Sequence, residues 1–355
     1  MSMYAKTTFD VSVAIPAYSR SIELVELLQS IYDQSVLPAE VVICEDMSPQ
    51  RDAIRSIAAA WREPFAAQGC ALNYHENERN LGYDGNVRRI IQAAKSTWVL
   101  LIGNDDLLLP GCIEAVAAYT AAYPEHRMIS RSFLMFKGSL KHELGFSQLS
   151  PEDHLFTTQN SESGIIMRAF GFVGGIVLHK EWADAIATDR YDGSLYYQIY
   201  LGAVAYCEVG IGYISRLIVG SRAGNPPLFG SASSEKGVHV PGAYTPKGRS
   251  KMWADLIRIC DDVGNQYGLL LAAEIKKELE VRQSFHIFEM MAGSSPRLMR
   301  ELKHEFLKLD LFGHPLPRAL YMVNVTLRGY SPIFYKGVRK LRNRLYALRY
   351  GHATH

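Results

Sequence analysis

Residues 98–110 constrain the fold of this 355-residue chain more than any other segment. They begin with an uninterrupted apolar run, Trp98 to Ile102, which is typical of a strand buried on both faces of a parallel sheet. The run is followed by two adjacent carboxylates, Asp105 and Asp106, and then by a Pro-Gly break. Open α/β sheets bind ligands at the carboxyl ends of their strands, so this segment predicts a binding site.

The adjacent acids have two interpretations. Neighbouring carboxylates repel each other unless a cation or a network of donors compensates them. Mg²⁺ and Mn²⁺ prefer such oxygen ligands, commonly one or two carboxylates together with substrate phosphates. Alternatively, Asn104 or Asp105 caps a helix that starts near Pro110. This segment alone leaves both interpretations open.

Strands and helices alternate through the first third of the chain. Apolar runs predict strands at 11–15, 41–44, 71–75 and 98–102, with helices at 22–32, 52–61 and 86–95. This alternation favours an α/β fold with a mostly parallel sheet between helices and right-handed crossovers. The second strand also ends in acids, Glu45 and Asp46, which points to one crevice at the strand ends.

Composition narrows the class of protein. An apolar content of 48% with 21% charged residues is typical of a folded globular chain, and a net charge of +2 gives no argument for nucleic-acid binding. No apolar run reaches the roughly 18 residues of a membrane span, and the N-terminus has no secretory pattern. The five cysteines form no Cys-x-x-Cys pair, which predicts reduced thiols in a cytoplasmic protein. Neither a Gly-x-Gly-x-x-Gly fingerprint after the first strand nor a P-loop is present, which disfavours dehydrogenases and P-loop kinases.

Four segments within residues 11–115 together resemble the family-2 inverting glycosyltransferases, which have the GT-A fold. Residues 13–20 are similar to the family's Ile-Pro-x-Tyr-Asn-Arg, and residues 42–48 stand where the family has a strand ending in Asp-Asp-Gly-Ser. Asn80, Gly82 and Asn86 match the family's Asn-x-Gly and the Asn after it. Residues 104–106 replace its Asp-x-Asp metal motif, with Asn104 in place of the first Asp. The sequences of residues 82–86 and 102–106 look most like those of bacterial enzymes that add sugars to O-antigen-type chains, including the abequosyltransferase-like branch.

The resemblance implies a site for a nucleotide and for Mg²⁺ or Mn²⁺. Tyr18 would stack on the base, and Asp46 would accept the N3–H of uracil or thymine, a group that cytosine lacks. Asp106 would be the main metal ligand, and Asp105 would hold the ribose or the metal. Glu45 is either a neighbour of the nucleotide or only a strand-end acid. The implied nucleotide-binding set is Pro16, Ala17, Tyr18, Glu45, Asp46, Asn80, Gly82, Asn86, Asn104 and Asp105.

The second half of the chain must supply the base that takes a proton from the acceptor hydroxyl. The family places this carboxylate in an acidic doublet at the start of a helix. The doublet is missing here, and Asp192 is the nearest acid, so we predict Asp192 as the base or, alternatively, as the cap of that helix. Further candidates are Asp153, Glu181 and Asp184.

His239 and a glycine-rich segment add two open assignments. Related GT-A folds place a C-terminal His on the metal, which makes His239 a predicted ligand unless it is a solvent-facing loop residue. Residues 171–175 either let the backbone approach the donor sugar or form a tight turn before a strand. We also expect a variable loop over 137–158 and a pair of strands over 210–218.

The C-terminal third is predicted to be helical. We divide the chain into a GT-A nucleotide-sugar-binding and catalytic domain, 1–235, and a mainly helical region, 236–355, with helices near 252–267, 269–291, 295–309 and 316–327. Residues 335–349 interleave cations with apolar residues and contain no acids, which predicts a basic amphipathic helix. This helix either docks on an anionic membrane or packs on the core.

The resemblance implies a metal-dependent inverting glycosyltransferase that moves one sugar from a nucleotide-diphosphate (or CMP/CDP-type) donor to a hydroxyl of a growing bacterial surface glycan. The acceptor would be lipid-linked O-antigen or similar, and the enzyme cytoplasmic or peripheral at the inner face of the plasma membrane. The Gln-x-x-Arg-Trp motif and the membrane spans of the processive polymerases are missing, which favours single-sugar addition. The alternative is a non-catalytic protein that binds sugar nucleotides or glycans and retains the fold.

Overall fold

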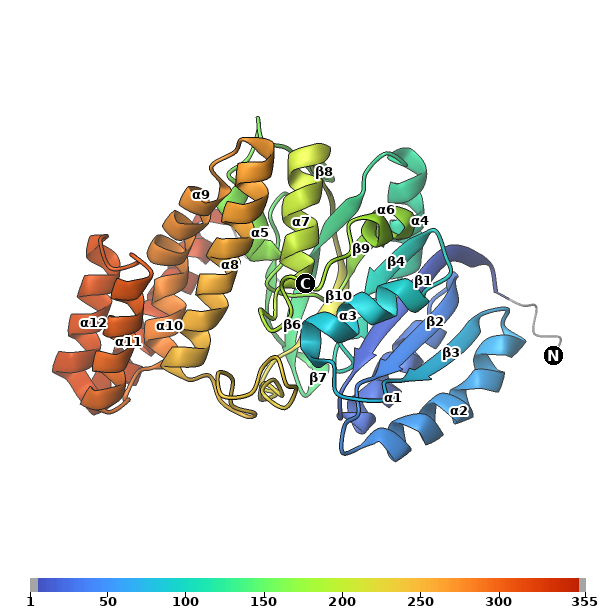
Figure 1. Ribbon diagram of the computed structural model, residues 1–355, viewed down its shortest axis with the longest axis horizontal. Coiled ribbons are helices and arrows are strands. Elements are labelled where there is room, and N and C mark those ends of the chain that lie inside the picture. Colours follow the sequence, from blue (N-terminus) through green and yellow to red (C-terminus); the bar gives the residue numbers. More distant parts are fainter. Residues whose placement is uncertain (1–5, 351–355) are drawn as a thin grey trace.

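A computed structural model describes residues 6–350 of the chain, with side chains up to Leu341. Its centre is a ten-stranded mixed sheet with the order β3-β2-β1-β4-β9-β6-β10-β5, to which β7 adds on β6 and β8 on β10 (Figure 1). The strands are β1 (Thr8–Ala17), β2 (Leu37–Glu45), β3 (Ala71–Glu76), β4 (Trp98–Leu101), β5 (Leu107–Leu108), β6 (Met128–Lys137), β7 (Ser139–Ser147), β8 (His154–Phe156), β9 (Ile176–His179) and β10 (Ile211–Arg222).

The half of the sheet formed by β1 to β4 is parallel: β1 pairs with β2 and β4, and β2 pairs with β3. Strand β9 then runs antiparallel to both β4 and β6, which makes the whole sheet mixed. Because β9 is reversed, its beginning lies at the edge where β1, β2 and β4 end. The glycine-rich segment before β9 is therefore brought to the predicted crevice.

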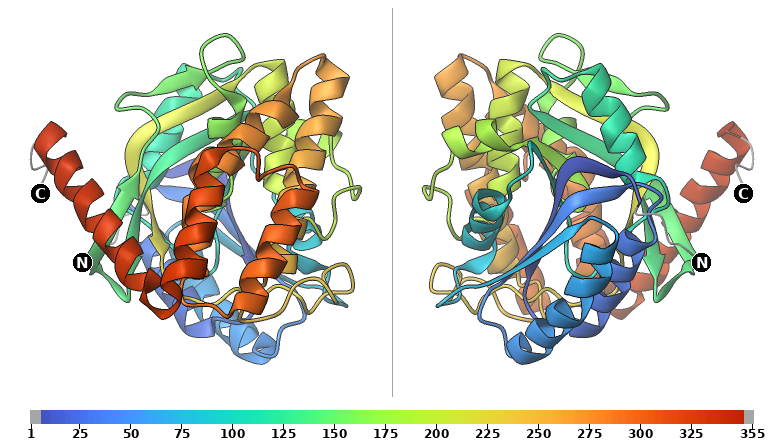
Figure 2. Two further views of the ribbon diagram at one scale, coloured as in Figure 1. Left: turned by 90° about the vertical axis from the view of Figure 1, so that its left-hand side faces the viewer. Right: turned by 90° about the vertical axis from the view of Figure 1, so that its right-hand side faces the viewer.

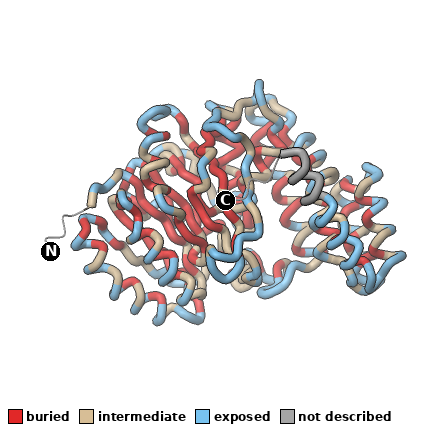
Figure 3. The backbone as a smooth tube through the Cα atoms, turned by 180° about the vertical axis from the view of Figure 1, so that it is seen from behind, coloured by how far each residue is buried: buried red, intermediate tan, exposed pale blue. Residues whose placement is uncertain are grey.

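Two hydrophobic cores lie on opposite faces of this sheet, and successive strand residues alternate between them. In β1, Val13 joins one core and Ala14 the other; in β4, Leu100 and Val99 do the same. The strands therefore form the buried centre of Figure 3. Helices α1 (Ser21–Tyr32), α2 (Arg51–Ala67) and α4 (Cys112–Ala122) cover the first face, and α3 (Gly82–Ala93), α5 (Ser163–Ala169) and α7 (Tyr197–Glu208) cover the second. The predicted α/β architecture is confirmed.

The C-terminal helices extend the second core. Along α8 (Pro246–Tyr267), Trp253, Leu256, Ile259 and Val263 recur at helical spacing and are buried in the same cluster as α7. The remaining helices are α9 (Leu271–Glu278), a π-helical turn (Leu279–Gln283), α10 (Ser284–Met290), α11 (Pro296–Lys308), α12 (Pro315–Leu327) and α13 (Ser331–Tyr350). The division of the chain at residue 235 stays a prediction, because this core is continuous with that of the sheet.

Two local predictions are wrong. Residues 137–158, expected to be a loop, contain β7 and β8; the side chains of β7 are mostly exposed, and its polar residues outnumber its few apolar ones. Residues 210–218, expected to be two strands, belong to the single strand β10, whose pairing shifts register between Ile214 and Leu217. The polar pair between those residues interrupts the apolar pattern without ending the strand.

Helix α13 leaves the body of the protein (Figure 2). Its buried contact is Tyr335, whose hydroxyl accepts a hydrogen bond from Asn324 of α12 and whose ring packs against Phe285. No helix among residues 6–350 is both long enough and apolar enough to span a bilayer.

Candidate active site

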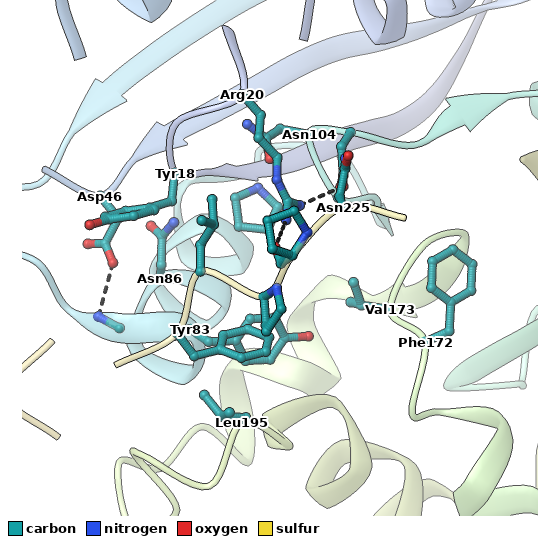
Figure 4. Close-up of a pocket in the computed structure, with 18 of the residues that line it drawn as sticks. Tyr18, Arg20, Asp46, Tyr83, Asn86, Asn104, Phe172, Val173, Leu195 and Asn225 are labelled. Atoms are coloured by element: carbon teal, nitrogen blue, oxygen red, sulfur yellow. Dashed lines mark hydrogen bonds and ion pairs between the residues drawn. The ribbon is translucent and has the colours of Figure 1, made fainter. Parts of the chain in front are cut away.

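A cavity of about 390 Å³ opens where β1, β2 and β4 end (Figure 4). It gathers most of the residues predicted for the site, although they come from four separate segments. Those that line it are Pro16, Tyr18, Asp46, Asn80, Gly82, Asn86, Asn104, Asp105 and Asp106. Ala17 and Glu45 do not line it.

Asp46 and Tyr18 lie together at one end of the cavity, with Asn86 beside them (Figure 4). The carboxylate of Asp46 accepts hydrogen bonds from the backbone N–H groups of Leu81 and Gly82, at 2.8 and 3.0 Å, and from the Asn77 amide. Burial raises the pKa of Asp46 to about 6, and these donors oppose the rise. This end offers an aromatic face and a fixed acceptor, which suits a flat heterocycle with an N–H group.

Gly82 and Glu45 explain how this end is built. Gly82 has a φ of 77°, and a Cβ there would lie 2.7 Å from Oε1 of Glu235, so glycine is needed at the close approach of the two loops. Glu45 is fully buried and accepts from the N–H groups of Met47 and Ser48 and from Arg51. It shapes the turn after β2, so of its two interpretations the strand-end acid is the right one.

The two adjacent acids lie at the next part of the cavity. Oδ2 of Asp105 accepts from Arg20 at 2.5 Å and from the Asn225 amide at 2.7 Å. Oδ1 of Asp106 accepts from the backbone N–H of Arg222 at 3.0 Å. Burial, and then the charge of Asp105, raise the pKa of Asp106 well above its usual range. The helix-cap alternative is wrong, because α4 begins after Gly111 and the Asn104 amide donates to the Ser19 carbonyl.

The geometry beside Gly103 fits a divalent cation. A Cβ at Gly103 would lie 3.0 Å from Oδ2 of Asp106 and 3.3 Å from Oδ1 of Asp105. These two oxygens therefore face one small space that only glycine leaves open, and neither accepts a hydrogen bond from any residue that the structure describes. Two carboxylate oxygens completed by phosphate and water oxygens form a coordination typical of Mg²⁺.

The structure does not bring His239 to these acids. Its ring lies against Pro227, Phe229 and Thr245 in a separate, smaller pocket, and Nε2 is buried without a hydrogen-bond partner. Burial lowers its pKa. Among the described residues no three His, Cys, Asp or Glu side chains converge, so a cation would have Asp105 and Asp106 as its acidic protein ligands. We therefore do not retain His239 as a ligand.

Arg131 lies fully buried behind the acids, and the sequence reasoning missed it. Its guanidinium donates to the carbonyls of Gly174 and Phe172, at 2.5 and 2.6 Å, and lies about 5 Å from the centroids of the Phe133 and Phe172 rings, which contact each other. Its charge favours the ionised form of Asp106, while burial lowers the pKa of Arg131 to about 9. A charged residue inside the apolar run of β6 was the available signal.

The glycine-rich segment that Arg131 holds through the carbonyls of Phe172 and Gly174 comes close to Asp106. Gly175 has a φ of 82°, and a Cβ at Gly174 would lie 3.1 Å from Oδ2 of Asp106. Residues 171–175 therefore form a tight turn before β9, and their backbone comes close to Asp106; contact of this backbone with a donor sugar stays a prediction. Phe172 and Val173 line the cavity from this turn (Figure 4).

The structure corrects the assignment of Asp192. Its two carboxylate oxygens accept from Arg88 at 2.5 and 2.8 Å, and Asp192 does not line the cavity. It is not the helix cap either. That role belongs to Asp84 of α3, which accepts from the N–H groups of Leu195 and Tyr197 at the start of α7 and whose pKa burial raises to about 7. The further candidates Asp153, Glu181 and Asp184 also lie outside the cavity.

Asp192→Asn is therefore expected to change stability and leave turnover within about threefold of wild type. Losing one partner of a half-buried ion pair costs about 1 kcal/mol, which for a chain of this length corresponds to a fall of about 1–2 °C in melting temperature. Arg88→Gln should give a similar fall, and a thermal melt with an activity assay checks both. A hundredfold loss of turnover in Asp192→Asn alone would restore its catalytic role.

Comparison of the sequence with known proteins agrees with this geometry. Residues 12–131 match the family described as Glycosyl transferase family 2, which spans the nucleotide end and both acids. Over these residues the chain is similar to the family-2 glycosyltransferases. It is 24% identical over 226 residues to abequosyltransferase RfbV of Salmonella typhimurium, covering 61% of this chain and 67% of that protein.

Two solved structures share the fold. TarS residues 1–349 of S. aureus in complex with UDP superpose with a TM-score of 0.60 at 15% identity, covering 93% of this chain and 92% of that one. The mannosyltransferase PcManGT of Pyrobaculum calidifontis, in complex with GDP-Man and Mn²⁺, has a TM-score of 0.50 at 14% identity and covers 95% and 85%. At these identities the likeness establishes the GT-A fold alone.

Proposed function

We propose that this enzyme transfers a single sugar from a nucleoside-diphosphate donor to a hydroxyl of a bacterial surface glycan of the O-antigen type, with the help of Mg²⁺ or Mn²⁺. The observation that carries the proposal is one cavity with Tyr18 and Asp46 at one end and the oxygens of Asp105 and Asp106 beside Gly103. The name of the abequosyltransferase relative and the UDP and Mn²⁺ complexes of the structural neighbours support it.

Asp46 and Tyr18 would fix the base, and Asp105 and Asp106 would hold the cation beside the diphosphate. The cation supplies positive charge that stabilises the leaving diphosphate. Arg20 forms an ion pair with Asp105, so its guanidinium would add a second positive charge near the diphosphate. The acceptor wall consists of apolar and neutral polar side chains together with one arginine: Phe172, Val173, Leu195, Tyr196, Gln198, Tyr244, Arg249 and Met252. Glu235 also lines the cavity, but its two carboxylate oxygens accept hydrogen bonds from the backbone N–H groups of Tyr83 and Gly230, and we assign no general base.

Calorimetric titration with UDP, GDP and CDP, each with Mn²⁺ and with EDTA, tests this function. UDP should bind best, and EDTA should weaken its binding at least about tenfold, because the cation links the diphosphate to two carboxylates. Equal UDP affinity in Mn²⁺ and EDTA would contradict the metal role. Failure of all three nucleotides to bind would contradict the donor class.

The pH dependence of UDP binding should follow Asp46. Only the carboxylate accepts a base N–H, and the folded pKa is about 6, so the accepting form is lost as the pH falls through 6. UDP affinity should drop about tenfold between pH 7.5 and pH 5, since each unit below the pKa costs a factor of ten. Asp46→Asn is the control, because it removes the titration of Asp46 and leaves that of the nucleotide phosphate. If UDP affinity depends on pH in the same way in wild type and Asp46→Asn, Asp46 does not cause the pH dependence.

We also propose that the C-terminal helices rest on an anionic membrane that carries a lipid-linked acceptor. Residues 311–341 contain no Asp or Glu, and their cations include Arg328, Lys336 and Lys340. Ile333 and Tyr330 are 67% and 74% exposed among these charges. Tyr335 meanwhile anchors α13 to the core, so each of the two predicted roles has its own support on the helix. The cations from Arg342 onward lie outside the described side chains.

Charge reversal tests the membrane role. Lys336→Glu with Lys340→Glu should lower co-sedimentation with phosphatidylglycerol vesicles at least tenfold, since each surface lysine contributes about 1 kcal/mol to such binding. Lys276→Glu with Lys277→Glu on α9 makes the same change of charge and should bind as wild type. Equal vesicle binding by wild type and both double variants would refute the proposal that Lys336 and Lys340 contact the membrane.

A further inference from the structure

Arg249 is a cavity residue to which the proposed function gives no role. It lies in the first turn of α8 and lines the main cavity together with Tyr196, Gln198 and Met252. These neighbours belong to the acceptor wall, whereas Asp105 and Asp106 follow β4 at the nucleotide side. Arg249 is therefore a cation on the acceptor side of the cavity, away from Asp105 and Asp106.

Three arginines line the cavity, and Arg249 differs from the other two. Arg20 is paired with Asp105, and Arg222 with Glu26. Within the described part of the chain, no carboxylate oxygen lies within 4.0 Å of a nitrogen of Arg249. Its Nε is buried and has no hydrogen-bond partner, and its Nη1 donates only to the Met252 sulfur at 3.9 Å.

The surroundings hold this guanidinium in place without neutralising it. It lies 4.0 Å from the centroid of the Tyr244 ring, a cation–π contact that fixes its plane. Tyr196 is a further titratable neighbour; burial raises its pKa and the charge of Arg249 opposes the rise. A partly buried, unpaired cation is unfavourable unless an anion completes its hydrogen bonds. A planar fork of donors matches carboxylate and phosphate oxygens.

We infer that Arg249 binds an anionic substituent, a phosphate or a carboxylate, on a sugar at the acceptor wall, separate from the diphosphate of the donor. The enzyme would thus act on a charged glycan and not on a neutral one. The inference rests on the proposed function, because it takes the nucleotide to lie at the Asp46 end. It adds the charge of the sugar substrate to that function.

The test uses the full chain saturated with UDP and Mn²⁺ and three sugar probes: methyl glucoside, glucuronic acid and glucose 6-phosphate. Ligand-observed NMR titrations should show at least one charged probe binding tenfold or more tighter than methyl glucoside. Arg249→Gln should abolish this preference and leave the Kd for UDP within about twofold, and Arg249→Lys should retain part of it. Lys247→Gln, on the exposed side of the same helical turn, is the matched control and should behave as wild type.

A second arm locates the anion. If UDP-glucuronate binds more tightly than UDP-glucose in wild type and not in Arg249→Gln, the anionic group belongs to the donor sugar, and equal binding assigns it to the acceptor. No preference for either charged probe or for UDP-glucuronate in wild type would overturn the inference. A large loss of UDP affinity in Arg249→Gln would overturn it too, because Arg249 would then pair with the donor diphosphate. Failure of wild type to bind UDP would instead refute the proposed function.

Discussion

Replacing Asp106 with alanine is expected to lower kcat/KM for sugar transfer by about 10³-fold or more. The substitution removes one of the two carboxylate oxygens that face the space beside Gly103 and leaves Asp105, already paired with Arg20, as the remaining acid there. A cation at a leaving diphosphate is worth several kcal/mol, and each 1.4 kcal/mol is a factor of ten in rate. A transfer assay measures the loss, and UDP titrations with Mn²⁺ and with EDTA should become identical in the variant.

Two comparisons make this result specific. Asp106→Asn keeps the shape of the side chain and should lose nearly as much activity, because an amide is a poorer cation ligand. Asp52→Ala removes a carboxylate from the exposed face of α2 and should leave both the rate and the metal dependence unchanged. UDP binding by Asp106→Ala that still responds to Mn²⁺ as in wild type would show that the cation binds elsewhere.

Replacing Arg131 with methionine should lower the free energy of unfolding by about 3 kcal/mol or more. Methionine keeps much of the apolar contact with Phe133 and Phe172 but donates nothing to the carbonyls of Gly174 and Phe172. It also leaves Asp106 buried without its nearby cation, and removing one member of such a buried arrangement typically costs 3–5 kcal/mol. Urea unfolding with a constant slope measures the change.

Activity and rescue separate the two effects of this change. Arg131→Lys keeps the charge and should recover part of the stability, although one ammonium cannot reproduce the two parallel donors. Arg62→Met on the exposed face of α2 is the control and should stay within about 0.5 kcal/mol of wild type. A stable Arg131→Met protein would mean that water replaces the guanidinium at both carbonyls.

The nucleotide half could be predicted from sequence because its elements are local and periodic. Strands such as β4 are buried on both faces, and their apolar runs are visible directly. Strand β7 could not be found this way, since its stability comes from pairing with β6 while its side chains face solvent. The reversal of β9 was also hidden, because strand direction depends on contacts between distant segments.

The same limit divides the candidate site. Tyr18 and Asp46 come directly after β1 and β2, and Asp106 lies in the turn after β4; because these three strands are parallel, the convergence of the three residues could be expected from topology. Asp192 was misplaced because its partner, Arg88, is more than a hundred residues away in the sequence. Arg131 and Arg249 belong to elements whose position is set only by tertiary packing, and no motif marks either of them.

Two carboxylates, Glu235 and Asp84, link the nucleotide loop to the acceptor wall by accepting hydrogen bonds from the first N–H groups of helices. Glu235 accepts from the N–H of Tyr83 at the start of α3, and the next residue, Asp84, accepts from Leu195 and Tyr197 at the start of α7. The nucleotide loop and the acceptor wall are thus parts of one rigid frame. Redesign of acceptor preference would therefore best exchange side chains that project from this frame, such as Gln198, and leave Asp84 and Glu235 intact. Chimeras that cut between residues 84 and 195 would need both halves of each contact from the same parent.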